Sequence, residues 1–155
     1  MSEPLNQKVL AKLMRYCAFQ ERSSKEVLNK LSTFTNESVQ VQLIYNYLIQ
    51  HNYLNDQRFA CSFASGKFRM NKWGRIKIKM GLINKGLDSK FIDQALDQIS
   101  EEDYSKTLYD LAVNKMKLIK AKNDFDLKIK LKRYLANKGY EADKVNQVIE
   151  SINKH

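Results

Sequence analysis

The chain has few of the residues that interrupt helices and few of those that build common catalytic and metal sites. Its 155 residues include one proline, five glycines, two cysteines and two histidines. So few turn formers favour a helical protein. His51 and His155 provide no HExxH motif, no zinc set and no supported His-based triad. The glycines at 74, 81 and 86 form neither a phosphate-binding loop nor a dinucleotide fingerprint. We therefore expect no enzymatic activity, no bound metal and no cofactor.

Long apolar runs are also missing. No stretch of 18 apolar residues is present, and the start, MSEPLNQKV, has no basic region followed by an apolar one. The sequence predicts a cytoplasmic protein with no membrane partner. Cys17 and Cys61 are isolated in apolar patterns, without a CxxC pair or a partner at metal-ligand spacing. We expect both to be buried free thiols.

Positive charge is abundant, and it is unevenly distributed. The net charge is +10. Residues 67–90 hold eight basic residues against one acid, and residues 106–138 hold ten against three. The stretch 91–105 between them has five acids and no base. This distribution favours a polyanion or an acidic protein surface as the partner.

Two similar basic stretches lie in these blocks, RIKIKMGLINKG at 75–86 and KIKLKRYLANKG at 128–139. The alternation in the first copy is typical of a strand. The second copy continues through Tyr134 and Leu135 at the spacing of a helix face. Both copies end in Lys-Gly, which is typical of a helix C-terminus with a left-handed glycine at Gly86 or Gly139. We interpret both as helices, the first over 72–85.

The similarity extends beyond these stretches. A shift of 53 residues superposes the apolar positions that follow Gly86 on those that follow Gly139, and a third, more degenerate helix pair begins near Ser23. A fixed period of this length is characteristic of repeat arrays. A further helical stretch precedes each pair, at 5–20, 56–69 and 101–121. The sequence predicts an all-α, elongated array of three tandem three-helix, helix-turn-helix-like repeats, one continuous body without long linkers, at 1–54, 55–100 and 101–155.

Polar residues stand where these helices would begin. Asn55-Asp56 can start one helix, and Ser100 can cap the next, with acids after it that suit its N-terminal dipole. The two basic helices would start after Asn71 and after Asn123 or Asp124.

The middle of the chain resembles the RecX family of regulators of the RecA recombinase. The matching elements are YLNDQRFA at 53–60, then Gly74, the basic-Ile-basic triplet at 77–79, Leu82 and Lys-Gly-Leu at 85–87. Arg22 with the serines after it is similar to an earlier Arg-x-x-Ser element of the family. Asn52, Asn55 and Gln57 depart from the family pattern, as does the aromatic Trp73 before Gly74, and they weaken an acidic helix start.

The resemblance implies a three-repeat helical protein that lies in the groove of the RecA filament on single-stranded DNA. There it would modulate strand exchange, ATP hydrolysis and co-protease activity, usually by inhibition, and so regulate DNA repair and the SOS response. Repeat arrays offer extended surfaces that can follow a helical groove, and positive charge suits a groove that contains phosphates and acidic side chains.

Helical geometry divides the predicted helix 72–85 into faces. Ile78 and Leu82 share one face, which corresponds to Leu131 and Leu135 in the second copy and should be the core of each repeat. A nearly opposite face carries Ile76, Met80 and Ile83. That face packs on a neighbouring repeat or meets a partner, and we favour packing because exposed apolar stripes are uncommon in stable monomers.

Basic residues in and near the two copies are the candidate contacts to a partner or DNA, with a stripe of Lys72, Arg75 and Lys79 between the two apolar faces. The candidates are Arg58, Lys67, Arg69, Lys72, Arg75, Lys77, Lys79, Lys85, Lys128, Lys130, Lys132 and Arg133. Each could instead belong to a solvated face, and Arg58 could equally hold its own helix start. Trp73 and Phe68 could stack on bases, although helix packing is the preferred interpretation. Tyr45, Tyr47 and Tyr53 are expected to pack in or between repeats.

Two functions of different class follow. The first is a monomeric regulator that binds the RecA–single-stranded DNA filament. The alternative is a helical module that binds single-stranded or structured nucleic acid directly, and a nuclease built from scattered acids is a weak third option. Both of the first two predict electrostatic affinity for DNA. They differ in whether the recombinase is needed for tight binding.

Overall fold

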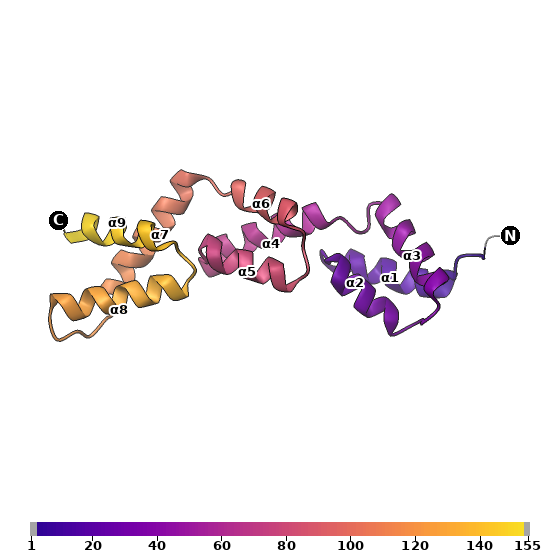
Figure 1. Ribbon diagram of the computed structural model, residues 1–155, viewed down its shortest axis with the longest axis horizontal. Helices are drawn as coiled ribbons and strands as arrows, with labels where there is room; N and C mark the ends of the chain where they lie inside the picture. The colour runs from indigo at the N-terminus through magenta and orange to yellow at the C-terminus, as the bar shows by residue number, and fades with distance from the viewer. Residues whose placement is uncertain (1–2, 154–155) are drawn as a thin grey trace. The chain divides into compact units, whose positions relative to one another are not determined.

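The computed structural model describes residues 3–153, and within that range it contains α-helices and no strand. The helices in chain order are α1 (Gln7–Phe19), α2 (Ser24–Ser32), α3 (Ser38–Gln50), α4 (Asp56–Asn71), α5 (Arg75–Asn84), α6 (Ser89–Asp97), α7 (Glu101–Met116), α8 (Asp124–Asn137) and α9 (Ala142–Asn153). They follow one another as three sets of three, joined by short connections (Figure 1). The prediction of an all-α chain of three-helix repeats is confirmed.

Side-chain caps explain several helix starts. The side chain of Ser23 accepts a hydrogen bond from the backbone N–H of Glu26, whose carboxylate accepts one from the N–H of Ser23, so the two form a capping box. The predicted caps Asn55, Ser100 and Asn123 likewise each accept a first-turn N–H. These starts are therefore set by local sequence.

Two predicted helix boundaries are wrong. The helix expected over 101–121 ends at Met116, where a turn at Lys117 and Leu118 leads into an irregular segment before α8. The helix expected over 72–85 begins at Arg75, and Asn71 is the last residue of α4. Lys72 has a φ of +59°, which interrupts the helical path between α4 and α5. The positive φ predicted after α5 and α8 is confirmed at Gly86 (+81°) and Gly139 (+99°).

By compactness the chain divides into two units. The first contains the described residues up to Ser62 together with Leu82–Gln94, and the second contains Phe63–Gly81 and the described residues from Ala95 onward. The division crosses α4, α5 and α6, so the middle helices contribute to both units. The segments 1–54, 55–100 and 101–155 remain a prediction of domain boundaries.

In the first unit, α2 packs against α1 and α3 around an apolar core. The core residues are Val9, Leu10, Leu13, Cys17, Val27, Leu31, Ile44, Leu48 and Leu54. Tyr45, Tyr47 and Tyr53 are partly buried against this core, as expected. Gln40 is a buried polar side chain, and it is fully used: its oxygen accepts from the N–H of Asn6 and its amide donates to the carbonyl of Pro4.

In the second unit, α7, α8 and α9 pack against one another (Figure 1). Leu131, Leu135 and Ile78 are at most 2% exposed, as their helical spacing predicts. Leu82, in the first unit, is also fully buried. The interpretation of these four positions as core is confirmed.

The two cysteines differ. Cys17 is buried and free, and burial raises the pKa of its thiol. Cys61 is free but only half-buried, so the expectation that both thiols are buried is wrong for it. It follows the fully buried Ala60 on α4, so it points away from the most buried side of that helix. None of the helices in the described range combines the length and the hydropathy that a membrane span requires.

Candidate partner-binding surface

The start of α5 is fixed by backbone contacts with the end of α8. The N–H of Gly74 donates to the carbonyl of Lys138 at 2.7 Å, and the N–H of Ile76 donates to the carbonyl of Gly139 at 3.0 Å. Two of the N–H groups that a helix start leaves without intrahelical partners are therefore satisfied by the carbonyls that end another helix. A Cβ on Gly74 would overlap the Gly139 carbonyl, and a Cβ on Gly139 would overlap Lys77. Glycine at both positions permits this approach.

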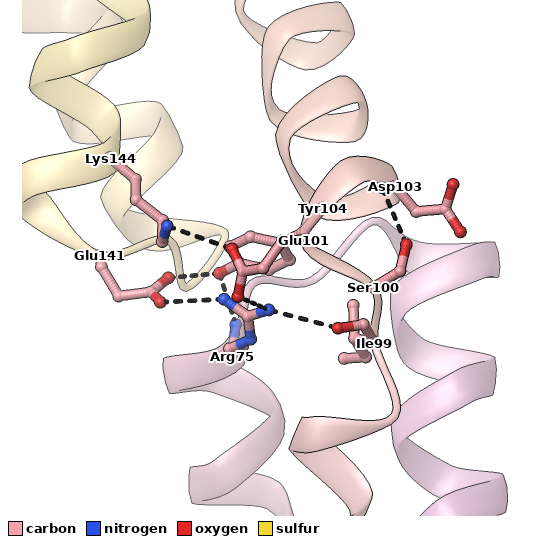
Figure 2. A network of polar contacts seen from close by, with 8 residues as sticks. All are labelled: Arg75, Ile99, Ser100, Glu101, Asp103, Tyr104, Glu141 and Lys144. Carbon is pink, nitrogen blue, oxygen red and sulfur yellow. Dashed lines mark hydrogen bonds and ion pairs between the residues drawn. The ribbon is translucent and has the colours of Figure 1, made fainter.

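Arg75 lies at the centre of a polar network beside this contact (Figure 2). Its backbone N–H donates to the Tyr104 hydroxyl at 2.9 Å, and its guanidinium lies 2.7 Å from a carboxylate oxygen of Glu101 and 3.5 Å from one of Glu141. The Tyr104 hydroxyl in turn donates to Glu141. The guanidinium carbon also lies 3.9 Å from the centre of the Tyr104 ring. With its side chain 17% exposed, Arg75 is committed to the protein's own structure.

The electrostatics of this network stabilise its present charge states. The Arg75 guanidinium lowers the pKa of the Glu101 carboxyl below its usual range, and Lys144 contributes in the same direction. Burial raises the pKa of the Tyr104 phenol, and its hydrogen bond to Glu141 adds to the effect. Tyr104 therefore stays neutral and Glu101 stays charged near pH 7. The network holds helices together and offers no activated nucleophile.

The predicted stripe of Lys72, Arg75 and Lys79 does not form. Lys72 precedes α5, and its ammonium donates to the carbonyl of Arg69 at 2.9 Å. Arg75 points into the network, so of the three predicted residues only Lys79 lies exposed on α5. The expectation failed because it continued the helix through a residue with positive φ.

Lys67 and Lys77 meet at the single tryptophan. Both ammonium groups lie 4.8 Å from the centre of the Trp73 ring, and the half-buried indole packs edge-on against Phe63. Phe68 is 8% exposed and stacks on Tyr104. These contacts support the helix-packing interpretation of both aromatic residues.

The remaining candidate cations of the second unit fall into two groups. Lys128 and Lys130 form ion pairs with the acids four residues before them. Lys79, Lys132 and Arg133 are exposed, and none has a carboxylate within 4.0 Å among the described residues. Exposed Arg69 likewise has no ion pair within the described range. These last four residues are available to a partner in a way that the paired cations are not.

Two candidates belong to the first unit. Arg58 lies 2.7 Å from Glu21 and also donates to the carbonyls of Asn52 and Tyr53 just before its own helix. Of its two open interpretations, these contacts support the one in which Arg58 holds the helix start. Lys85 lies 3.8 Å from Glu26, a weaker pair.

The apolar face of α5 contradicts one expectation. Ile76, Met80 and Ile83 are 50%, 53% and 47% exposed, so the favoured interpretation, in which they pack on a neighbouring repeat, is wrong. On the other face of α5, Ile78 and Leu82 are fully buried.

Sequence reasoning missed the partners of Arg75 and the acceptor of the α5 N-terminus. Tyr104 and Glu141 were not singled out, and no local pattern links them to Arg75. The sequence predicts the left-handed conformation of Gly139, but it does not predict the close contact between Gly139 and Gly74. Within the described range, no group of three or more His, Cys, Asp or Glu residues could hold a metal ion.

Comparison with known proteins is consistent with this architecture. Two domain families match: the second three-helix domain of RecX over residues 55–96 and the third over residues 101–149. The regulatory protein RecX of Clostridium beijerinckii is 32% identical over 133 residues, which cover 84% of this chain and 62% of the relative. That of Lactococcus lactis subsp. lactis is 34% identical over 140 residues, 88% of this chain and 52% of the relative. The chain thus spans less than two thirds of the length of these relatives.

Solved structures show the same fold. A crystal structure of RecX from Lactobacillus salivarius superposes with a TM-score of 0.85 at 24% identity, covering 96% of this chain and 97% of that one. A second crystal structure of regulatory protein RecX has a TM-score of 0.83 at 20% identity, covering 93% and 71%. With two RecX domains matched over more than half of its length and RecX relatives above 30% identity, the chain belongs to the RecX family.

Proposed function

We propose that this protein binds the RecA filament on single-stranded DNA as a cytoplasmic monomer and inhibits its recombinase, ATPase and co-protease activities. By this action it regulates DNA repair and the SOS response. Membership in a family of regulatory proteins supports the regulatory role. The structural observation that carries the proposal is that four of the exposed candidate cations have no carboxylate within 4.0 Å among the described residues: Arg69, Lys79, Lys132 and Arg133.

These cations suit a partner that contains both phosphates and acidic side chains. Exposed charges gain little from each other in water, but they attract a polyanion at long range and release its counterions on contact. With a net charge of +10, the protein is drawn to a nucleoprotein filament by the same term that draws it to bare DNA. Selectivity for the filament over bare DNA must therefore come from contacts that are not purely electrostatic.

Direct binding to nucleic acid is the second candidate, and the surroundings of Trp73 favour it most. A tryptophan flanked by Lys67 and Lys77 has the composition of a single-strand binding site. The indole is half-buried and both ammonium groups lie close to its ring, so a base would have to displace them before it could stack. This competition makes the filament the better-supported partner.

Binding at two salt concentrations distinguishes the candidates. The protein is titrated against single-stranded DNA alone and against the same DNA coated with RecA and a slowly hydrolysed nucleotide. We expect tighter and less salt-sensitive binding to the coated DNA, together with slower ATP hydrolysis by the filament. Equal or tighter binding to bare DNA would contradict the proposal and favour the nucleic-acid module.

Matched charge variants then test the exposed cations. The first variant carries Lys79→Gln, Lys132→Gln and Arg133→Gln. The control removes three cations that already have carboxylates nearby: Lys85→Gln, Lys128→Gln and Lys130→Gln. Both lose the same net charge, so a larger loss of filament affinity in the first variant would identify local contacts. Equal losses would mean that net charge alone acts.

A further inference from the structure

An apolar groove lies in the second unit between α5 and the last two helices. Ile76, Ala136, Ala142 and Val145 form its apolar lining, and Lys132 and Asn146 add polar groups. Its volume is about 290 Å³. This volume is close to the lower end of the range for small-molecule sites, about 300 Å³, and suits bulky apolar side chains more than a cofactor.

The apolar surface continues outside the groove. Met80 lies one turn after Ile76 on the same side of α5 and is 53% exposed. Ile129, which is 39% exposed, lies on the side of α8 that also carries Lys132 and Ala136. Exposed apolar groups on two helices that line one groove are a feature of interaction sites.

Lys132 lines the groove, and further exposed cations lie on the two helices that carry this apolar surface. Helix α5 contains no acidic residue, and its exposed Lys79 lies one residue from Met80. On α8, Lys132 and Arg133 have no carboxylate within 4.0 Å among the described residues. Of the acids next to the groove lining in sequence, Glu141 is bound by Tyr104, whereas Asp143 is exposed. Among these sequence neighbours of the lining, the exposed cations Lys79, Lys132 and Arg133 outnumber the exposed acid Asp143.

We infer that this groove binds a bulky apolar side chain carried by an acidic segment of a protein partner. The inference rests on the proposed function and assigns the segment to the protein subunits of the filament. A phosphate would lose hydration against an apolar lining that contains one cation. A base would lack an open aromatic ring, since Tyr140, which also lines the groove, is 2% exposed and packs against Tyr104. An acidic peptide with an apolar anchor satisfies both the lining and the rim.

Removal of the exposed apolar groups tests the groove. The variant Ile76→Gln/Met80→Gln is compared with Val39→Gln/Ile49→Gln, a control pair on α3 with similar exposures of 51% and 45%. We expect filament binding to weaken about tenfold or more in the first pair and to stay within twofold in the control. Circular dichroism establishes that both pairs keep wild-type helix content. Equal affinities of the two pairs would overturn the inference.

A photoreactive amino acid at position 80 identifies what lies against the groove. Cross-linking to a recombinase peptide with net negative charge and a bulky apolar residue is the expected result. Cross-linking to DNA, or filament binding of normal strength without a cross-link, would overturn the inference and leave the proposed function standing. If the wild-type protein does not bind the filament at all, the proposed function fails and the groove assignment fails with it.

Discussion

The contact between Gly74 and Gly139 predicts that Gly74→Ala is strongly destabilising. A methyl group at position 74 would overlap the Gly139 carbonyl, and the backbone there has no flexible side chain that could move aside. Relief of the overlap must separate α5 from the end of α8 and weaken the two hydrogen bonds donated by Gly74 and Ile76. Overpacking costs about 1 to 3 kcal/mol and each hydrogen bond contributes about 0.5 to 1.5 kcal/mol. We expect a loss of about 2 to 6 kcal/mol.

Urea unfolding monitored by two signals measures this loss. Far-ultraviolet circular dichroism follows all helices, and fluorescence follows Trp73, the single tryptophan, next to the substituted residue. The tryptophan signal should shift to lower urea at least as far as the dichroism signal. The control is Gly66→Ala inside α4, where an added Cβ meets no atom within 4 Å. It should stabilise by about 0.5 to 1 kcal/mol. Unchanged unfolding of Gly74→Ala would refute the close approach.

Three further predictions concern the polar contacts. Tyr104→Phe removes the hydroxyl that links the partly buried Arg75 N–H and Glu141 carboxylate and should cost about 1 to 3 kcal/mol in urea unfolding, whereas Tyr109→Phe, at a residue 41% exposed, should change stability by less than about 0.5 kcal/mol. The lowered pKa of Glu101 means that its contribution is present above its ordinary value of 4.5 and is lost as the pH falls through the lower folded value. Glu101→Gln should therefore flatten the acid side of a stability–pH profile, and an unchanged profile would contradict the ion pair with the guanidinium. Arg58→Ala should cost about 1 to 2 kcal/mol in thermal unfolding, because two carbonyls and a carboxylate lose their donor, while Arg69→Ala should stay within about 0.5 kcal/mol.

The arginines show why basic composition is an incomplete guide to a binding surface. Arg58 and Arg75 are prominent in the basic sequence, yet each is held by carboxylates within its own unit. Lys79 and Lys132 have no such acceptor in the described range. A partner at the second unit would therefore contact lysines beside an apolar groove. Arg75 would not be available to it, because its guanidinium is paired with Glu101 and Glu141.

Local signals in the sequence determined the secondary structure of this protein. Ser100 and Asn123 were assigned as caps and Gly139 as a left-handed terminus because each acts within a few residues of its own helix. The core positions Ile78 and Leu131 followed from helical periodicity, which is also local. The internal repeat strengthens these assignments, since the stretches 75–86 and 128–139 show the same pattern independently.

Only the tertiary structure decided which cations are free and which apolar face stays open. The Arg75 guanidinium donates to Glu101, which lies 26 residues away in the sequence. The carbonyl of Lys72 accepts a hydrogen bond from the hydroxyl of Tyr140, 68 residues away. Nothing within one helical turn encodes such pairings. The exposure of Met80 was equally beyond helical spacing, because periodicity assigns a residue to a face but does not determine whether another helix covers that face.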